Sequence, residues 1–244
     1  MDLIRRLFAG ATRGPDYPPD ERDRQDLTLF GLRFPLRASM AIVAATALLV
    51  LDQLGWLASQ PMQFAFPDGS PLDATGVQRF VLFLVVPLAI VVFGFRDRPS
   101  RYGLGLGDWR WGAGLLIAGL VVMLPIILGL SSLDQFREYY RPSARPAVAL
   151  VLDHLMELVP AEFLLRGFLM FALWRRIGPL ALVVQLIPFV LTHVGKPEIE
   201  LWSTFIGGSV FAWLNWRTGS ILWSALGHVY VLTLMELAVR GAPV

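Results

Sequence analysis

The sequence predicts an all-α fold, a polytopic membrane helical bundle with about seven transmembrane helices. Composition and the grouping of apolar residues lead to this prediction. Hydrophobic residues make up 55% of the chain, charged residues make up 16%, and the mean hydropathy is +0.58, whereas charged residues account for about 25% of soluble domains. The apolar residues also gather in stretches close to the roughly 17–25 residues that a helix needs to cross a bilayer.

Seven apolar stretches follow one another along the chain. They lie at residues 36–57, 79–95, 111–130, 147–173, 177–195, 200–216 and 220–239. In the sixth stretch, four small residues at one- and four-residue offsets favour close packing on a neighbouring helix. These are Gly207, Gly208, Ser209 and Ala212.

Residues 1–37 form a charged segment that precedes the first span. Its longest apolar stretch is too short for the core of a signal peptide, so we expect a cytosolic arm. We divide the rest of the chain into a three-span scaffold at residues 38–140 and a four-span working core at residues 141–244. The division follows the polar residues at membrane depth, which are sparse in the first three spans and accumulate from about residue 147 onward.

The distribution of Lys and Arg predicts the orientation. Fourteen of these 21 residues fall in the arm and in connections on the same side of the membrane, six fall on the opposite side and one lies inside a span. Because cytoplasmic loops carry the excess of basic residues, we expect a multi-pass protein of the inner or plasma membrane with a cytosolic N-terminus. The net charge of +2 follows from this bias, so we expect membrane lipid and no nucleic acid as a partner.

Glu162 and Arg166 stand four residues apart inside the fourth stretch, where the bilayer makes an unpaired charge costly. On a helix this spacing puts both side chains on one face, so they can pair, and the pair has to face protein or a water-filled cavity. Two interpretations are open at this point. The pair either fixes one helix against its neighbours or forms part of a functional site.

All three histidines, His154, His193 and His228, lie in or at the ends of apolar stretches. Histidine is the side chain best suited to proton transfer near neutral pH. Two histidines from separate helices, beside a buried Glu–Arg pair, indicate a shared site. A Glu with one or two His residues can hold and deprotonate a water while a donor stabilises the oxyanion, which together hydrolyse an amide.

Other protease signatures are absent from the sequence. It contains no His-Glu-x-x-His helix and no Gly-x-Ser-x-Gly turn, and the lack of cysteine excludes thiolate chemistry. The run Gly105-Leu106-Gly107-Asp108 resembles the Gly-x-Gly-Asp of presenilin-type aspartyl proteases. It lies in a basic loop, however, where Asp108 lacks the buried carboxylate partner that a shared-proton dyad requires.

The region from about 140 to 240 resembles the CPBP family, the CAAX-prenyl and bacteriocin-processing membrane proteases also called Abi. Three motifs carry the resemblance, in matching order and spacing. They are Glu162-Phe163-Leu164-Leu165-Arg166-Gly167, Phe189-Val190-Leu191-Thr192-His193, and Arg217-Thr218-Gly219-Ser220 followed by His228. The resemblance implies an intramembrane endopeptidase that acts on a membrane-associated peptide or protein.

The resemblance also implies roles for the catalytic candidates. Glu162 would activate a water, Arg166 would orient that carboxylate, and His193 and His228 would position the water or stabilise the oxyanion. Two positions depart from the family pattern. The first Glu of its Glu-Glu-x-x-x-Arg motif is Ala161 here, and the Asn or Asp four residues after the last histidine is Leu232. Replacements for that lost donor would come from Thr192, Tyr230 or Asn215.

Nearby charged residues have simpler interpretations. Glu157 is about 140° around the helix from Glu162, so the two are poor partners for one water. We expect Glu157 to pair with His154, three residues earlier on the same face. Lys196 and Glu200 flank a proline at a membrane boundary, where a solvated pair is the ordinary expectation.

Metal use and activity leave alternatives open. Glu162, His193 and His228 would be the ligands of a zinc ion if one is bound, but we favour a metal-free glutamate mechanism without cofactors, because an Arg paired to the carboxylate suits a base better than a ligand. Ala161 and Leu232 motivate a second hypothesis, a weak or inactive relative that acts as a membrane binding or immunity protein. A third is a small transporter or proton relay that uses the same polar core.

Overall fold

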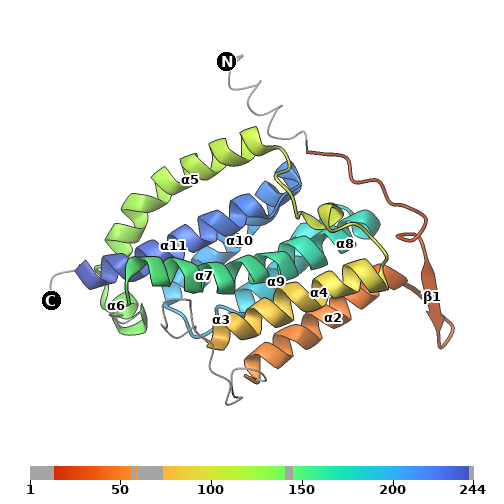
Figure 1. Ribbon diagram of the computed structural model, residues 1–244, viewed down its shortest axis with the longest axis horizontal. Helices are drawn as coiled ribbons and strands as arrows, with labels where there is room; N and C mark the ends of the chain where they lie inside the picture. Colours follow the sequence, from red (N-terminus) through yellow and green to blue (C-terminus); the bar gives the residue numbers. More distant parts are fainter. Residues whose placement is uncertain (1–13, 56–58, 60–73, 141–144, 242–244) are drawn as a thin grey trace.

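The computed structural model of the protein describes residues 14–55, 59, 74–140 and 145–241. The first thirteen residues of the expected arm and the last two of the first expected span lie outside this part. Within it, the chain forms an all-α helical bundle with one small β-hairpin at one end (Figure 1). The expected fold class is confirmed.

The described residues form seven helical rods, which lie where the apolar stretches predict them. Five of these rods are single α-helices: α2 (Leu36–Gln53), α5 (Trp109–Leu130), α9 (Leu180–Leu191), α10 (Glu198–Thr218) and α11 (Leu222–Gly241). The second rod joins α3 (Ala74–Arg79), η1 (Phe80–Val85), α4 (Val86–Ala89) and η2 (Ile90–Gly94). The fourth joins α7 (Ala147–Glu162), η4 (Phe163–Leu169) and α8 (Met170–Ile177).

Four rods in the described part are long and apolar enough to cross a membrane by themselves, namely Leu36–Gln53, Ala74–Gly94, Trp109–Leu130 and Leu222–Gly241. The fifth rod, α9, has only 12 residues. It is shorter than the stretch 177–195 that hydropathy predicts, because the chain turns after Leu191. These lengths and the apolar surface fit a polytopic membrane protein.

Three smaller elements lie between or before the rods, and the sequence analysis did not predict them. They are the hairpin strands β1 (Asp26–Leu29) and β2 (Leu32–Pro35), the single 3₁₀ turn η3 (Pro99–Tyr102) and the short helix α6 (Asp134–Tyr140).

Prolines accompany the π-helical turns of two rods. In the second rod, η1 and η2 flank the α4 turn that contains Pro87. In the fourth rod, η4 begins three residues after Pro160. A proline has no N–H for the helical ladder, and a π-turn is one way in which a helix absorbs the resulting shift in its hydrogen bonds. Arg166 therefore lies in a π-helical turn rather than in a regular α-helix.

Small residues bring the rods together. Ala38, Ala41 and Ala45 are buried along α2, which packs on η4 and α8. A Cβ at Gly208 would lie 2.6 Å from the side chains of Leu186 and Phe189, so α10 needs glycine there to approach α9. Small interfacial residues of this kind are typical of membrane helices.

The expected role of the small residues in the sixth span is only partly confirmed. Gly208 and the fully buried Ala212 face a neighbouring helix. Gly207 faces open space and Ser209 is exposed. Only residues on one side of α10 can meet a neighbour, and a four-residue spacing selects 208 and 212 for that side.

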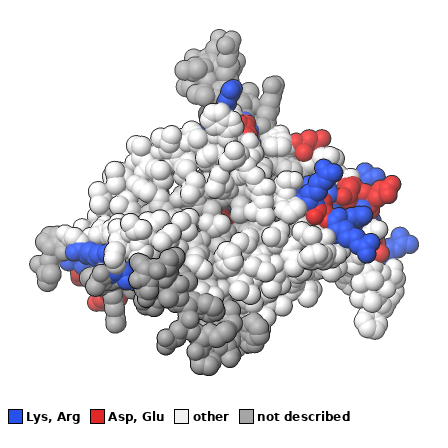
Figure 2. Space-filling model, viewed as in Figure 1, with Lys and Arg blue, Asp and Glu red and all other residues white. Residues whose placement is uncertain are grey.

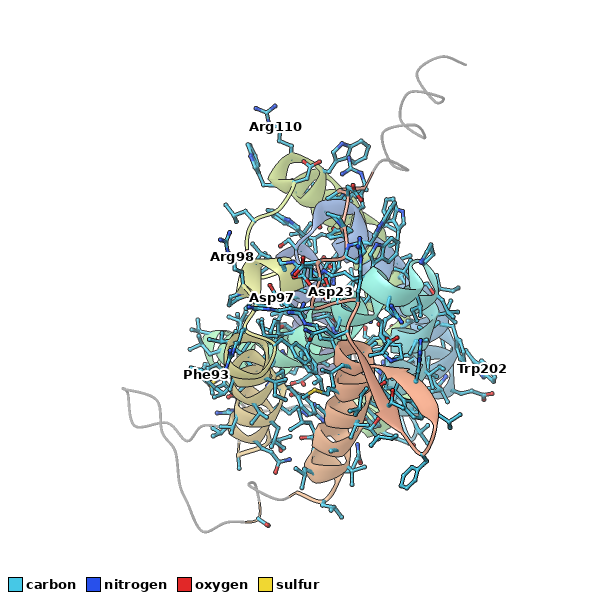
Figure 3. All side chains as sticks on the ribbon, turned by 90° about the vertical axis from the view of Figure 1, so that its right-hand side faces the viewer. Asp23, Phe93, Asp97, Arg98, Arg110 and Trp202 are labelled. Atoms are coloured by element: carbon cyan, nitrogen blue, oxygen red, sulfur yellow. The ribbon has the colours of Figure 1, made fainter. Side chains whose placement is uncertain are left out.

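The outer surface is apolar between two charged ends. Figure 2 shows Lys, Arg, Asp and Glu gathered mostly at the two ends of the helices, with largely uncharged surface between. Phe93 and Trp202 project from the flanks of the bundle and are 78% and 62% exposed (Figure 3). On α5 only Gly112 and Ile127 are buried. This surface suits contact with lipid tails.

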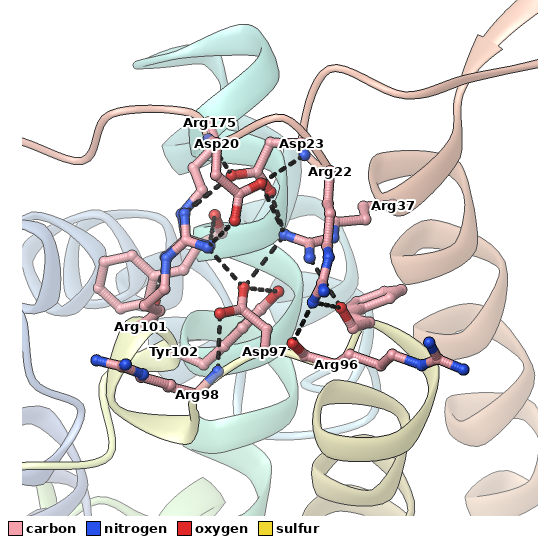
Figure 4. A network of polar contacts seen from close by, with 12 residues as sticks. Asp20, Arg22, Asp23, Arg37, Arg96, Asp97, Arg98, Arg101, Tyr102 and Arg175 are labelled. Carbon is pink, nitrogen blue, oxygen red and sulfur yellow. Dashed lines mark hydrogen bonds and ion pairs between the residues drawn. The ribbon is translucent and has the colours of Figure 1, made fainter.

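A network of ion pairs ties the N-terminal arm to one end of the bundle (Figure 4). Arg37 at the start of α2 donates from Nη1 to Asp23 (2.6 Å) and Asp97 (3.2 Å), and from Nη2 to the Phe95 carbonyl (2.9 Å). Arg101 contacts the same two aspartates at 2.9 Å each. We call this the arm network.

The arm network brings together segments that the distribution of Lys and Arg assigned to the same side of the membrane. Burial raises the pKa of Asp20, but hydrogen bonds from the Asp23 backbone N–H and from Arg101 outweigh it and lower that pKa to about 2. Arg175 at the end of the fourth rod donates to the Arg101 carbonyl. The arm, the loop before α5 and the end of α8 therefore lie at the same end of the bundle.

We expect Arg37→Met to destabilise the protein by about 3–5 kcal/mol, because the buried Asp23 and Asp97 would lose a buried partner. Thermal or urea unfolding in detergent measures this effect. Arg24 is exposed in the same arm, and Arg24→Met should stay within about 0.5 kcal/mol. Equal effects of the two substitutions would contradict a structural role for the arm network.

Candidate active site

The Glu162 and Arg166 side chains form a fully buried ion pair on the fourth rod. Both residues are 0% exposed, and Arg166 Nη1 lies 2.5 Å from Glu162 Oε1. The predicted pairing is therefore confirmed. Because a lone charge at this position would be very costly, each residue requires the other.

Two side chains of α11 complete the surroundings of the Glu162 carboxylate. The Ser224 hydroxyl donates to Oε2 at 2.7 Å, and His228 Nδ1 lies 2.9 Å from Oε1. Ser224 and His228 are four residues apart, so they lie on one face of α11, one turn above each other. The carboxylate thus accepts three hydrogen bonds from two rods.

Ser224 was not among the predicted site residues. The only sequence signal was its position four residues before His228 in an otherwise apolar helix. That spacing places the two side chains on the same face of the helix. It is therefore a sufficient reason to count Ser224 among the candidate site residues.

His193 reaches the site from the turn after α9. Its Nδ1 lies 2.8 Å from the Phe189 carbonyl oxygen, and its ring centre lies 6.5 Å from that of His228, with the two planes 16° apart. Pro188 does not break α9, which continues to Leu191. The three predicted groups, Glu162, His193 and His228, therefore meet at one place.

Both histidines turn the same nitrogen toward a fixed acceptor. A carbonyl and a carboxylate oxygen only accept hydrogen bonds, so Nδ1 carries the proton in His193 and in His228. This tautomer leaves Nε2 of each neutral ring as its basic nitrogen. The site therefore offers two basic nitrogens on rings that lie side by side.

Aromatic rings enclose the charged pair. The Arg166 guanidinium carbon lies 4.1 Å from the ring centre of Phe189 and 5.6 Å from that of Phe211. Phe211 of α10 also lies 5.7 Å from the His228 ring. Contacts of this kind stabilise a cation that protein shields from solvent, so the two rings favour the charged form of Arg166.

Of the three substitutes for the missing family donor, Asn215 has a free amide. Thr192 donates to the Phe189 carbonyl and Tyr230 donates to the Leu120 carbonyl. Asn215 is 0% exposed, and neither amide atom has a partner among the described residues. It lies on α10 one turn from Phe211, on the same face.

The register of the α10–α11 turn places Asn215 near the site. Gly219 ends α10 with φ +71°, and α11 starts at Leu222. Counting outward from this tight turn, Asn215 is level with Ser224, just as Phe211 is level with His228. Arg166 Nε and Nη2 are also buried without a partner in the described structure. Buried unpaired groups of this kind are rare and call for an explanation.

Comparison with protein families identifies the region that carries this site. Residues 143–233 match the family model described as type II CAAX prenyl endopeptidase, Rce1-like. Residues 143–233 are an Rce1-like CAAX protease domain. The match includes all four predicted catalytic residues and lies inside the predicted core at 141–244. No curated protein and no solved structure matches the chain.

The two residues that depart from the family pattern, Ala161 and Leu232, lie at different places in this Rce1-like domain. Ala161, where the family has its first glutamate, is partly exposed, whereas Glu162 beside it is fully buried. Leu232 lies one turn beyond His228 on α11. Of the two glutamate positions in the family motif, this chain therefore retains the glutamate at the position that protein encloses.

Other polar candidates lie outside the site. Glu157 pairs with Arg79 rather than with His154, so the expected pairing is wrong. His154 instead bonds Thr233 (2.8 Å) and Glu236 (3.2 Å) on α11. The reason is that α7 packs against both α3 and α11. α3 supplies the partner of Glu157, and α11 supplies the partners of His154.

Two further expectations concern charged residues near the membrane boundary. Lys196 and Glu200 form the expected ion pair at 2.8 Å, but with side chains only 21% and 17% exposed the pair is less solvated than expected. The Tyr140 hydroxyl donates to Glu200 at 2.6 Å. Asp108 caps the first turn of α5 and pairs with Arg217. It is thus a structural residue, as its loop position indicated.

The residues of the domain do not fit a metal ion as they stand. No group of three His, Cys, Asp or Glu side chains in the described part has the spacing of a metal site. Glu162 Oε1, the oxygen nearest to His228, already accepts from Arg166 and from His228. Both donors would have to leave before a cation could bind there.

We expect the buried pair of the Rce1-like domain to be energetically coupled. Arg166→Met should cost about 3–5 kcal/mol because it leaves the Glu162 charge unpaired, whereas the double variant Glu162→Met/Arg166→Met should cost less than Arg166→Met alone. Unfolding in detergent measures the cycle. Arg176 pairs with Asp26 at the surface, and Arg176→Met should cost about 0–1 kcal/mol. Strictly additive effects at 162 and 166 would contradict the coupling.

Proposed function

We propose that this chain is an intramembrane endopeptidase that hydrolyses a peptide bond of a membrane-associated peptide or protein, with His228 as the base that activates water. The 2.9 Å contact between His228 Nδ1 and Glu162 Oε1 carries the proposal. A carboxylate bonded to Nδ1 fixes the imidazole and stabilises its protonated form, as in other acid–histidine pairs.

This assignment revises the role that the family resemblance gave to Glu162. Glu162 is fully enclosed and its two oxygens already accept bonds from Arg166, His228 and Ser224. Of these groups His228 has the most exposed side chain, 14% against 1% for Arg166 and 0% for Glu162. In the proposal Glu162 is therefore a positioning residue, and the proton of water goes to His228.

The proposed reaction uses both histidines. A water donates one hydrogen to Nε2 of His228 and the other to Nε2 of His193, which leaves an oxygen lone pair free for attack. The ring centres lie 6.5 Å apart, so both rings border the place proposed for this water. As the oxygen adds to the carbonyl carbon, His228 takes one proton, and it later gives this proton to the leaving amine.

Asn215 is the proposed donor to the oxyanion. Its Nδ2 is buried and unpaired in the described structure, and it lies one helical turn from Phe211, whose ring contacts His228. A preorganised amide of this kind typically contributes about 3–4 kcal/mol to transition-state stabilisation. It would replace the hydrogen-bond donor that the family has at the position of Leu232.

We further propose that the end with the arm network faces the cytosol and that substrates enter from that side. This end carries most of the Lys and Arg residues. Ser224 is the third residue of α11, and α11 starts at this end. The site is therefore only one or two helical turns below the proposed cytosolic surface.

We expect His228→Gly, His193→Ala and Glu162→Ala to lose cleavage by at least about 100-fold, in line with the loss of a general acid–base group. Product analysis by mass spectrometry in detergent, with a farnesylated peptide and an unmodified membrane peptide as probes, measures this. His154 contacts Thr233 and Glu236 instead, so His154→Ala should stay within about threefold of the wild type.

Added imidazole should restore part of the cleavage by His228→Gly and none of that by Glu162→Ala. Rescue of Glu162→Ala by formate, without rescue of His228→Gly by imidazole, would show that Glu162 is the base. A folded wild-type protein that cleaves neither probe, and whose cellular effect survives Glu162→Ala, would contradict the endopeptidase and support a membrane binding protein.

Removal of divalent metal should leave cleavage unchanged, because the Glu162 oxygen nearest to His228 accepts from Arg166 and His228 at the same time. The measurement is cleavage after dialysis against 1,10-phenanthroline, together with the zinc content of the purified protein. Loss of activity that stoichiometric zinc restores would overturn this expectation.

A further inference from the structure

The hairpin β1–β2 has one apolar and one polar face. Cross-strand partners pair Leu27 with Phe34 and Leu29 with Leu32. Because alternate residues of a strand point to opposite faces, these four side chains share one face. The other face carries the pair Thr28–Arg33.

The apolar face has no cover among the described residues. Leu27, Leu29, Leu32 and Phe34 are 41%, 47%, 61% and 38% exposed. A two-stranded hairpin with a bare apolar face is at best marginally stable in water. Something outside the described structure therefore has to cover this face.

Phe30 at the tip strengthens this argument. The two loop residues, Phe30 and Gly31, have φ +51° and +79°, a conformation that two-residue hairpin loops require and that Asn-Gly normally supplies. A bulky residue is unfavourable there. Phe30 is also fully exposed, at 102%. A strained, exposed aromatic residue is a reason to look for a role of that side chain.

The surroundings of the hairpin identify lipid as the cover. β2 ends at Pro35 and α2 starts at the next residue. The exposed side of α2 is apolar as well, since Met40, Ile42 and Val43 are 43%, 44% and 68% exposed. In Figure 1 the strands run across the ends of the helices rather than along them, and Figure 3 shows the hairpin in front of α2. If the helices cross the membrane, the hairpin lies in its plane.

Charge agrees with this placement. Arg176 of α8 pairs with Asp26 at the base of the hairpin at 2.7 Å, which fixes its root to the bundle. Arg33 lies on the polar face, opposite the leucines. With the apolar face toward the acyl chains, Arg33 would point to the phosphate groups and water, the arrangement of interfacial amphipathic elements.

We propose that the β1–β2 hairpin is an in-plane membrane anchor that lies on the lipid surface beside α2 and inserts Leu29 and Phe30 at the boundary between headgroups and acyl chains. Interfacial elements of this kind typically bury their apolar face roughly 5–10 Å deep. The anchor would hold the N-terminal arm, and with it the arm network, flat against the membrane.

The absence of cysteine from the chain gives a direct test. Single-cysteine variants Leu29→Cys, Phe30→Cys, Thr28→Cys and Val43→Cys are labelled with a nitroxide in vesicles of phosphatidylcholine and phosphatidylglycerol. Collisions with oxygen report lipid contact, and collisions with a water-soluble nickel chelate report exposure to water. Val43 on α2 is the lipid-exposed reference, and Thr28 on the polar face is the matched control.

Labels at 29 and 30 should collide with oxygen several-fold more than with nickel, as at 43, whereas the label at 28 should show the opposite ratio. Nickel-dominated collisions at 29 and 30 would overturn the proposal. Protection from both reagents, with spin–spin broadening that vanishes on dilution with unlabelled protein, would also overturn it in favour of a second copy. Unchanged thermal unfolding in each labelled variant confirms that the fold is intact.

Discussion

The structure depends on one constraint, the need to keep the charge of the fully buried Glu162 inside a helical bundle. Arg166 balances the charge from the next turn, and Ser224 and His228 supply hydrogen bonds from α11. Because a buried carboxylate is tolerated only when its oxygens are bonded, this requirement fixes the rotation of α11 against the fourth rod. The same contact gives His228 its tautomer, so the feature that stabilises the bundle also prepares the site.

A second set of charges works at the membrane boundary. The arm network connects the arm, α2, the loop before α5 and α8 through Arg37, Arg101 and Arg175. Helices in lipid gain little from the hydrophobic effect between one another, so polar contacts at their ends and small residues between them decide how they assemble. The site lies only one or two turns from this end, since Ser224 is the third residue of α11, and through Arg175 the network holds the fourth rod, which carries Glu162.

Much of this was predictable from the sequence. Hydropathy located the seven rods, the i,i+4 spacing predicted the Glu162–Arg166 pair, and the family resemblance selected His193 and His228 from separate helices. Counting depth along each helix could not show that they converge, because errors of a few residues at the span ends exceed a hydrogen-bond distance. Glu157 pairs with Arg79, and His154 pairs with Glu236. Long-range packing decides between competing partners, and a single sequence does not show that packing. The hairpin alternation of Leu27 to Phe34 was readable in principle, but Phe-Gly is not the dipeptide that marks such turns.

In the proposed mechanism, the departures from the family pattern change which side chains carry out the chemistry. With Ala161 in place of a glutamate, no second carboxylate stands beside Glu162, and the remaining one is committed to Arg166, Ser224 and His228. An acid in that position acts most readily through the imidazole it holds. The same reasoning applies to the other departure, since Leu232 offers no donor while the neighbouring helix holds Asn215 buried with its amide unpaired. If both substitutions are compensated in this way, the two roles have moved to other side chains around the same carboxylate.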